Sequence, residues 1–552
     1  MRKPSIKKRY VLSIIVSVFL LWSFTAPQND KYFEILKNLD IFATMYKEVN
    51  ANYVDDINPN TIMETGIDAM LSTLDPYTVY YPEDQIEDVR TENTGQYGGI
   101  GAVIGEKYDK KVMVVMPNKG FAADRAGLIR GDEIISINGI DVANDYDKAS
   151  EYLRGQASSK IELGIIRGSN ESLTIEVELE KIELPNVPYF GMVSEDVGLI
   201  KLTGFREKAS REVKSALRAL KKEGAEHIII DLRDNGGGLL GEAVNISNLF
   251  IEKGELVVTT KGKLKEMNAT YKTLNVATDT DIPVAVLVNS SSASASEIVA
   301  GVMQDYDRGV LIGRKSFGKG LVQRTMPLSY NSQMKVTIAK YYTPSGRCIQ
   351  AIDYSNRNED GSVGKIADSL KTAFQTNNGR VVYDGGGVDP DFLTPMRKMA
   401  PITRSILQSD LFFRFANEYN GSVEVPEAAV DFEVTEDLYA AFKNWMSDKE
   451  LIYTSELQEE VARFKEAAEG TNDYQKISEF IAQLEGAVSN DLVSDLDANK
   501  DEIKIFLKDE FVARNFLDEG RLEASFENDN DVIKAIEVLT DSQNYQKVLQ
   551  GN

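Results

Sequence analysis

The spacing of hydrophobic and polar residues changes several times along this chain of 552 residues. Between residues 27 and 94, hydrophobic residues recur every three or four positions, as in Y-F-E-I-L-K-N-L-D-I-F and T-I-M-E-T-G-I-D-A-M-L-S-T-L. This spacing is typical of amphipathic helices. Asp75-Pro76 ends the second run, because proline disfavours helical backbone in the residue before it. The pattern predicts a helical N-terminal region over residues 27–94.

Residues 95–183 instead contain short hydrophobic runs separated by turns. V-M-V-V-M at Val112–Met116 and I-E-L-G-I-I-R at Ile161–Arg167 read as strands, and Asn138-Gly139 is a tight-turn signal between them. With G-G-I-G-A-V-I and G-D-E-I-I-S-I-N-G in the same order, the region resembles a PDZ domain. We therefore expect a PDZ β domain over residues 95–183.

The glycine-rich stretch Gly98–Ile104 carries the binding function that this resemblance implies. Its glycines would let successive backbone N–H groups point at the terminal carboxylate of a peptide. The peptide backbone would then add as a strand to the neighbouring sheet edge. The expected peptide-binding residues are Gly99, Ile100, Gly101 and Ala102.

The second half of the chain changes from alternating strands and helices to helices alone. From 184 to 395 the continuous apolar runs V-G-L-I-K-L, H-I-I-I-D-L-R and V-A-V-L-V-N alternate with helical stretches. Such runs are typical of buried parallel strands, and the alternation indicates an α/β core. From 396 to 552 the chain is acidic and helix-periodic, as in I-S-E-F-I-A-Q-L. This last region is predicted to be a helical accessory domain.

The first 26 residues have the form of an export signal. Five basic residues in M-R-K-P-S-I-K-K-R-Y precede sixteen residues without charge. Cleavage after Ala26 would place Phe24 where a small residue is preferred, so an uncleaved signal anchor is the alternative. In both cases the basic end stays in the cytoplasm. The rest of the chain is then expected in the cell envelope or periplasm, and the anchored form would be held at the inner membrane.

Composition narrows the possible chemistry. Hydrophobic residues make up 42% of the chain, which is enough for globular cores. The formal net charge of −24 argues against nucleic acid as a partner, because no basic field would offset the repulsion of phosphates. The single cysteine, Cys348, excludes an intramolecular disulfide, and with one histidine, His227, few metal ligands are available. We expect neither a metal nor a cofactor.

The stretch S-A-S-A-S-E, Ser292–Glu297, has two interpretations. Ser294 followed three residues later by Glu297 fits a capping box at the start of a helix. A serine in that place could also be a nucleophile, because the positive end of the helix dipole stabilises developing negative charge. The spacing alone leaves both interpretations open, and they are compatible.

A catalytic serine needs a base and hydrogen-bond donors for an oxyanion. Because His227 is the only histidine and is interpreted as structural, lysine is the alternative base. Burial disfavours the ammonium form of a lysine. Lys319, between two glycines in F-G-K-G-L-V-Q, fits such a desolvated position. The glycine turn of D-L-R-D-N-G-G-G, Asp231–Gly238, would free backbone N–H groups for the oxyanion.

In this order, these motifs resemble the carboxyl-terminal processing peptidases, or tail-specific proteases, which are Ser-Lys peptidases with an inserted PDZ domain. The resemblance runs from about Leu36 to Leu393 and includes L-S-T-L-D-P-Y-T-V-Y, S-A-S-A-S-E-I-V-A-G, Y-Y-T-P-S-G-R and G-G-G-V-D-P-D. It implies an α/β multi-domain protein whose protease core, over 184–395, is of the crotonase/ClpP-like type.

The resemblance also implies a catalytic set. Ser294 would be the nucleophile, Lys319 the base and Gln323 the hydrogen-bond partner of that lysine. On a straight strand, four residues would separate the last two by about 13 Å. The chain must therefore bend near Gly320 if they are to meet.

The expected oxyanion donors are the backbone N–H groups of Ala295 and Gly237, with Gly238 as a neighbour. The family usually has D-L-R-x-N-P-G-G, whereas here Gly236 replaces the proline. Glycine makes the turn more flexible, but the chemistry needs only a backbone N–H group.

The implied function is a serine endopeptidase that recognises and cleaves the C-terminal tails of exported proteins. The PDZ domain would capture the tail and gate the protease. One alternative is an inactive tail-binding scaffold, which the complete set of Ser294, Lys319 and Gln323 disfavours. Another is an acyl hydrolase or ligand-binding protein on a related core, which would need no reader of peptide tails. The oligomeric state is not determined by the sequence.

Overall fold

The computed structural model describes residues 29–168, 171–358, 361–471, 473–488 and 491–551. The predicted signal peptide or anchor, residues 1–26, lies outside them. Among the described residues, no helix is long and apolar enough to cross a membrane. The chain divides into two compact units, Met1–Tyr80 and Tyr81–Asn552.

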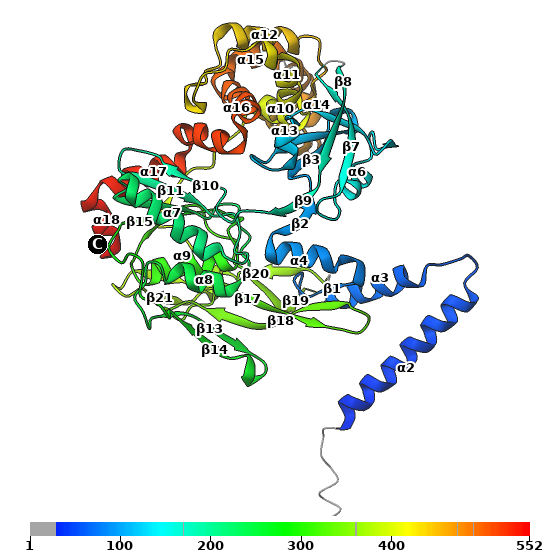
Figure 1. The fold of residues 1–552 in the computed structure, drawn as a ribbon, viewed down its shortest axis with the longest axis vertical. Helices are drawn as coiled ribbons and strands as arrows, with labels where there is room; N and C mark the ends of the chain where they lie inside the picture. Colours follow the sequence, from blue (N-terminus) through cyan, green and yellow to red (C-terminus); the bar gives the residue numbers. More distant parts are fainter. Residues whose placement is uncertain (1–28, 169–170, 359–360, 472, 489–490, 552) are drawn as a thin grey trace, which may run out of the picture. The chain divides into compact units, whose positions relative to one another are not determined.

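The first unit is helical, as the hydrophobic spacing predicts (Figure 1). The side chain of Asn58 caps its second helix by accepting the backbone N–H of Asn60 at 2.9 Å, and the helix then begins at a proline. The elements of this part are α2 (Asn29–Asn52), α3 (Pro59–Ser72) and the short strand β1 (Val79–Tyr81), which ends at the boundary of the unit.

A small antiparallel β domain lies near the start of the second unit. Its strand order is β3-β4-β5-β7-β8, so β3 forms one edge of the sheet. Asn138 and Gly139 make the turn between β5 and β6 with φ of 52° and 75°, which confirms the predicted tight turn. The elements are α4 (Ile86–Thr94), β2 (Gln96–Gly99), β3 (Ala102–Lys107), β4 (Lys111–Pro117), α5 (Ala122–Arg125), β5 (Glu133–Ile137), β6 (Ile140–Asp141), α6 (Tyr146–Tyr152), β7 (Lys160–Arg167), β8 (Glu171–Glu178) and β9 (Glu180–Glu183).

An α/β core follows, built on a six-stranded sheet of order β10-β11-β12-β15-β16-β23. The edge strand β10 is antiparallel to β11, and the later pairs are parallel. The three apolar runs predicted as buried strands are β11, β12 and β15, which is confirmed. The strands are β10 (Tyr189–Met192), β11 (Val197–Lys201), β12 (His227–Asp231), β15 (Val284–Val288), β16 (Val310–Gly313) and β23 (Phe392–Leu393).

Helices cover both faces of this sheet (Figure 1). Side chains on one face, such as Ile230 and Val286, pack with α7, α8 and α9. The alternate side chains, such as Ile229 and Leu287, pack with α17 and α18. The last two helices of the chain thus complete the core of the sheet. The helices are α7 (Ala209–Glu223), α8 (Leu240–Ser247), α9 (Ala295–Asp305), α17 (Asn530–Thr540) and α18 (Ser542–Leu549).

A second sheet contains antiparallel pairs of strands that lie between strands of the first sheet along the chain. Its long strand β18 pairs with β13 and with β17, and β13 pairs with β14. The strands are β13 (Leu256–Gly262), β14 (Ala269–Lys272), β17 (Leu321–Pro327) and β18 (Gln333–Tyr342). Two short hairpins follow, β19 (Ile352–Arg357) with β20 (Val363–Lys365), and β21 (Ala373–Gln375) with β22 (Val381–Tyr383).

The remaining helices confirm the predicted helical C-terminal region, and most of them share a core that is rich in aromatic side chains. In this core Phe412 stacks on Phe442, and Phe415 packs against Phe442 edge-to-face. The helices are α10 (Pro401–Gln408), α11 (Leu411–Tyr419), α12 (Glu436–Met446), α13 (Glu456–Glu469), α14 (Tyr474–Ala487), α15 (Leu492–Ala498) and α16 (Lys500–Ser525). The domain boundaries expected at residues 95, 184 and 396 stay predictions.

Candidate active site

Ser294 lies in the turn between β15 and α9. Its backbone has φ 57° and ψ −111°, a combination that residues with a side chain rarely adopt. Such strain persists only where the surroundings hold it, and sharp strand-to-helix turns present the nucleophilic serine in α/β-hydrolases. Ser294 is half-buried and lines a cleft with a volume of about 590 Å³. The turn therefore presents its hydroxyl group to a cleft.

Glu297 is the buried anchor of this turn. Its carboxylate accepts the backbone N–H groups of Ser294 (2.8 Å), Lys319 (2.9 Å) and Gly318 (2.7 Å). It also accepts the hydroxyl group of Ser316 at 2.6 Å. Burial raises the pKa of Glu297, and these four hydrogen bonds act in the opposite direction. The glutamate of the predicted capping box thus joins the serine turn to the lysine segment.

Lys319 lines the same cleft as Ser294. The segment around it is closely packed, because a Cβ atom at Gly318 would lie 2.4 Å from the Cβ of Ala351. Gly318 also has a φ of 88°, and a Cβ atom at Gly320 would lie 2.7 Å from a backbone nitrogen. Both flanking positions therefore require glycine.

A second buried side chain bridges the two candidate catalytic residues. The hydroxyl group of Tyr341 lies 2.7 Å from the carbonyl oxygen of Lys319 and 3.1 Å from that of Ser294. Its single proton can serve one of them at a time. Burial raises the pKa of Tyr341 well above its ordinary value, so this hydroxyl group stays protonated.

Gln323 lies on β17 and also lines the cleft. The pairing of β17 with β18 is irregular between Val322 and Gln323, where the register shifts. The strand therefore departs from straight geometry close to the bend that the sequence requires near Gly320. The side-chain amide of Gln323 donates to the hydroxyl oxygen of Thr337 at 3.1 Å. Its predicted bond to Lys319 stays a prediction.

Gly237 packs against the serine turn. It has a φ of 101°, and a Cβ atom there would lie 2.9 Å from the backbone nitrogen of Ala295, so the position requires glycine. Its N–H group donates to Oδ1 of Asn235 at 2.9 Å. Gly238 and Ala295 line the cleft as well. The N–H group of Ala295, at the first position of α9, belongs to those without a partner inside the helix. The residues predicted to supply the oxyanion donors thus line one cleft.

The two loops that meet at Ser294 are bonded to one another. The hydroxyl group of Ser292 donates to the carbonyl oxygen of Leu232 at 2.8 Å. The carbonyl oxygen of Asn235 accepts the N–H group of Ala293 at 3.0 Å and the hydroxyl group of Ser296 at 2.8 Å. The outer serines of S-A-S-A-S-E therefore hold the loop, while Ser294 between them faces the cleft.

The walls of the cleft combine polar and apolar side chains. Arg206 and Lys335 add positive charge to them, and Glu92 adds negative charge. The apolar side chains are Phe205, Leu239, Leu240, Ile298, Leu321 and Val322. These apolar side chains can contact small or apolar side chains of an extended peptide. No group of three or more histidine, cysteine, aspartate or glutamate side chains among the described residues could hold a metal ion.

The predicted peptide-tail loop lies at the edge of the β domain. Gly99–Ala102 leads directly into the edge strand β3. Beside it is a groove of about 290 Å³, lined by Ile104 of β3, by Tyr146 and Ser150 of α6, and by Leu153. An edge strand offers unpaired backbone N–H and C=O groups to a further strand. The loop, the edge and the groove together can receive an extended peptide.

Three positioning residues were not predicted from the sequence as parts of the site. Glu297 was expected only as a helix cap, and neither Asn235 nor Tyr341 was assigned a role. Asn235 belongs to D-L-R-D-N-G-G-G and Tyr341 to Y-Y-T-P-S-G-R, both of which carry the family resemblance. Their presence in those motifs was the available signal, but their partners lie far away in the sequence.

Comparisons with known proteins agree with these features. Three family models match the chain. Residues 196–355 match the model described as "Peptidase family S41", and residues 113–167 match "PDZ domain". Residues 402–539 match "Probable PDZ-protease, C-terminal helical domain". A carboxy-terminal-processing protease of Bartonella bacilliformis is 33% identical over 349 residues, which are 62% of this chain and 80% of that protein. A probable CtpA-like serine protease of Staphylococcus aureus is 37% identical over 316 residues, 56% of this chain and 62% of that protein.

Solved structures with similarity to this chain include two proteases. One is the photosystem II D1 C-terminal processing protease, with 25% identity and a TM-score of 0.35, over 64% of this chain and 92% of that chain. The other is a putative S41 protease of Bacteroides fragilis, with 16% identity and a TM-score of 0.39, over 72% of this chain and 92% of that chain.

The fold and the family matches define a protease with an attached PDZ domain and a helical C-terminal region. The chain belongs to the carboxy-terminal-processing protease family, within Peptidase family S41. This confirms the family that the order of the sequence motifs indicates.

Proposed function

We propose that this chain is a serine endopeptidase that cuts near the C-termini of exported proteins, with Ser294 as nucleophile and Lys319 as base. One observation carries the proposal. Both residues line a single cleft, and the buried carboxylate of Glu297 accepts a backbone N–H group from each of them. A scaffold that only binds peptide tails has no need for a strained serine turn tied to a lysine in this way.

The proposed reaction follows from this arrangement. Neutral Lys319 takes the proton of the Ser294 hydroxyl group as its oxygen attacks the peptide carbonyl, and Gln323 orients the lysine. The proton then passes to the leaving amine, and water hydrolyses the acyl-enzyme. The N–H groups of Ala295 and of Gly237 or Gly238 stabilise the oxyanion. Gly237 can do so only when its N–H group leaves Asn235, whose side chain holds it in this structure.

The proposed substrates are proteins with exposed C-terminal tails of small or apolar residues. The apolar side chains within the cleft and the groove beside β3 support this class. The name of the Bartonella bacilliformis relative, a carboxy-terminal-processing protease, agrees with it. Export to the cell envelope or periplasm, with or without an N-terminal anchor at the inner membrane, is part of the proposal because of the basic and apolar first 26 residues.

The β domain is proposed to gate the protease as well as to bind the tail. In its favour, Arg130 of the β domain is ion-paired with Glu510 of α16 at 2.8 Å, and both side chains are largely buried. If a bound tail moved the β domain, this ion pair would have to break, or α16 would have to move with the β domain. Gating would therefore involve the C-terminal helices.

The test compares the full chain with Ser294→Ala on an unfolded protein that ends in an apolar tail. Wild type is expected to remove the tail region, and the variant to be slower by at least about 10³-fold. Binding of a tail peptide, measured by fluorescence anisotropy, should be equal for both. Equal cleavage by the two proteins would exclude Ser294 as nucleophile. Tail binding without cleavage by wild type would establish the scaffold instead.

A further inference from the structure

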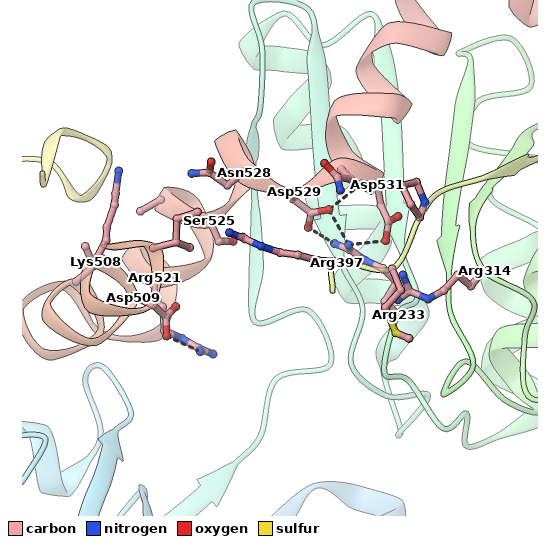
Figure 2. A pocket seen from close by; sticks show the side chains of 16 residues that line it. Arg233, Arg314, Arg397, Lys508, Asp509, Arg521, Ser525, Asn528, Asp529 and Asp531 are labelled. Carbon is pink, nitrogen blue, oxygen red and sulfur yellow. Dashed lines mark hydrogen bonds and ion pairs between the residues drawn. The ribbon is translucent and has the colours of Figure 1, made fainter. Parts of the chain in front are cut away.

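The last helices of the chain reach the loop that carries the candidate oxyanion glycines. α17 and α18 pack on the protease sheet, and α17 begins beside the end of β12. Figure 2 shows Arg233, from the loop after β12, next to Asp529 and Asp531 at the start of α17. Arg233 lines a cavity of about 380 Å³ there, whereas Gly236–Gly238 of the same loop line the catalytic cleft. The loop thus faces the C-terminal helices at one end and the cleft at the other.

Arg233 is held from two sides. Its guanidinium group donates to Oδ1 of Asp529 (2.9 Å) and to Oδ2 of Asp531 (2.9 Å). On the other side it makes a bidentate contact with Asp231 at 3.0 and 2.8 Å. A planar guanidinium group with this many carboxylate partners is confined in position and orientation. Only 14% of the Arg233 side chain is exposed, so solvent weakens these contacts little.

The start of α17 is itself well defined. Asp529 caps the helix by accepting the N–H groups of Asp531 (3.0 Å) and Val532 (3.2 Å). The hydroxyl group of Thr394, which follows β23, donates to the carboxylate of Asp531. Asp531 and Thr394 are both buried. The two aspartates therefore present a rigid pair of carboxylates to Arg233.

Arg233 lies two residues before Asn235 and four before Gly237. Asn235 makes several of the contacts that set the glycine turn against the serine turn. Its side-chain oxygen accepts the N–H group of Gly237, and its side-chain NH₂ group donates to the carbonyl oxygen of Leu202 at 2.7 Å. Its backbone carbonyl oxygen accepts the N–H group of Ala293. A shift of Arg233 would pass into this turn, because only Asp234 lies between Arg233 and Asn235.

We propose that Asp529 and Asp531 are positioning residues of the protease, which hold the oxyanion turn in place through Arg233. The inference rests on the proposed function and gives the end of the C-terminal region a role in the reaction. Because these residues act on the turn and touch no substrate, their loss should lower kcat and leave KM unchanged.

The test replaces both carboxylates in the full chain, as Asp529→Asn with Asp531→Asn. Asparagine keeps the volume and remains a good helix cap, so the helix should persist. We expect kcat to fall roughly 10-fold, less than the loss of an oxyanion donor itself, with KM within about twofold of wild type. The inhibition constant of a peptide aldehyde, whose adduct needs the oxyanion site, should rise by the same factor. Glu537→Gln, which removes an exposed ion pair with Lys534 on the same helix, should change none of these values.

A second substitution shows whether the aspartates act through Arg233. Arg233→Lys keeps the charge but loses the planar fork, and should lower kcat in the same way. Combined with the two asparagines, it should add little further loss, because the residues act as one unit. Multiplying effects, an unchanged kcat, or a change in KM alone would overturn the inference.

Two further comparisons keep the test decisive. If the double variant does not fold, as judged by circular dichroism, Arg233→Lys and Thr394→Val take its place with the same expected direction. Unchanged kcat and aldehyde inhibition in both would overturn the inference. Failure of the proposed function would be recognised by a different result, because Ser294→Ala would then cleave as wild type does.

Discussion

The catalytic cleft and the groove of the β domain differ in what holds the backbone that would contact a substrate. In the cleft, buried side chains bind the loops: Glu297 ties Ser294 to Lys319, and Asn235 ties the glycine turn to the serine turn. In the groove, the backbone that would contact a peptide is strand β3, at the edge of a regular sheet. The difference teaches where substitutions should act. Changes in the cleft should lower kcat, and changes in the groove should raise KM.

The largest expected effect follows from replacing the proposed base in the cleft. Lys319→Arg keeps a positive charge in place, but arginine stays protonated and cannot accept the serine proton. Cleavage should fall by roughly 10³-fold, the contribution of a general base, while tail binding is unchanged. Steady-state kinetics and fluorescence anisotropy measure the two quantities. The control is Lys315→Arg. Lys315 lies in the same segment as Lys319, and its exposed side chain pairs with Asp389. Substantial activity in Lys319→Arg would contradict a lysine base.

A smaller loss is expected at the carboxylate that joins the two turns. Glu297→Gln keeps the shape but puts an NH₂ group against backbone N–H donors, so at least one of the four hydrogen bonds is lost. We expect kcat to fall roughly 10²-fold without a change in KM. Glu266→Gln, at an exposed position, serves as the matched control. A higher KM with normal kcat would show that Glu297 does not position the cleft.

The same residue gives a dependence on pH. Burial raises the pKa of Glu297, so its neutral form persists to higher pH in the folded protein, where it accepts fewer hydrogen bonds. Activity should therefore rise as the pH rises through this raised pKa, and that part of the acid limb should be missing in Glu297→Gln. The sign for stability is opposite. The contribution of Glu297 is fully present below its ordinary pKa of 4.5 and is lost as the pH rises through the raised value. Identical acid limbs in both proteins would contradict this.

The groove should respond in the other kinetic parameter. Gly101 has a φ of 73°, and a Cβ atom there would lie 2.4 Å from the Cβ of Phe121. Gly101→Val should therefore distort the loop and raise KM for a tailed protein by about tenfold, a loss of about 1.4 kcal/mol in binding. The kcat for a short peptide without a tail should not change. Gly127→Val, where φ is 83° but no atom lies near, controls for backbone strain alone. An effect on kcat equal to that on KM would erase the distinction between the two sites.

The smallest effect is expected at the one departure from the family motif. Gly236 is not one of the glycines with a positive φ in the described part of the chain, and a Cβ atom there would meet no atom within 4 Å. Gly236→Pro should thus be accepted, raise the stability by about 0.4–1 kcal/mol and change kcat by less than about twofold. Thermal unfolding and steady-state kinetics measure both. Loss of activity would show that the turn needs the freedom of glycine.

Much of the fold could be predicted because it depends on local pattern. The apolar runs of β11, β12 and β15 become buried strands, because a short continuous apolar run is typical of a strand that is covered on both faces. Asn138-Gly139 makes its turn because both residues accept positive φ. The position of α17 and α18 on the protease sheet could not be predicted in this way. Their periodicity shows that one face is buried, but does not identify the surface that buries it.

The order of its motifs by itself determined the family of this protein, and S-A-S-A-S-E and F-G-K-G made Ser294 and Lys319 the candidates for nucleophile and base. Only the tertiary structure decided which side chains hold those candidates together. Glu297 reaches Lys319 across 22 positions, Asn235 reaches Ser296 across 61, and Arg233 reaches Asp531 across 298. A hydrogen bond depends on distance in space, and a linear pattern records only separation along the chain.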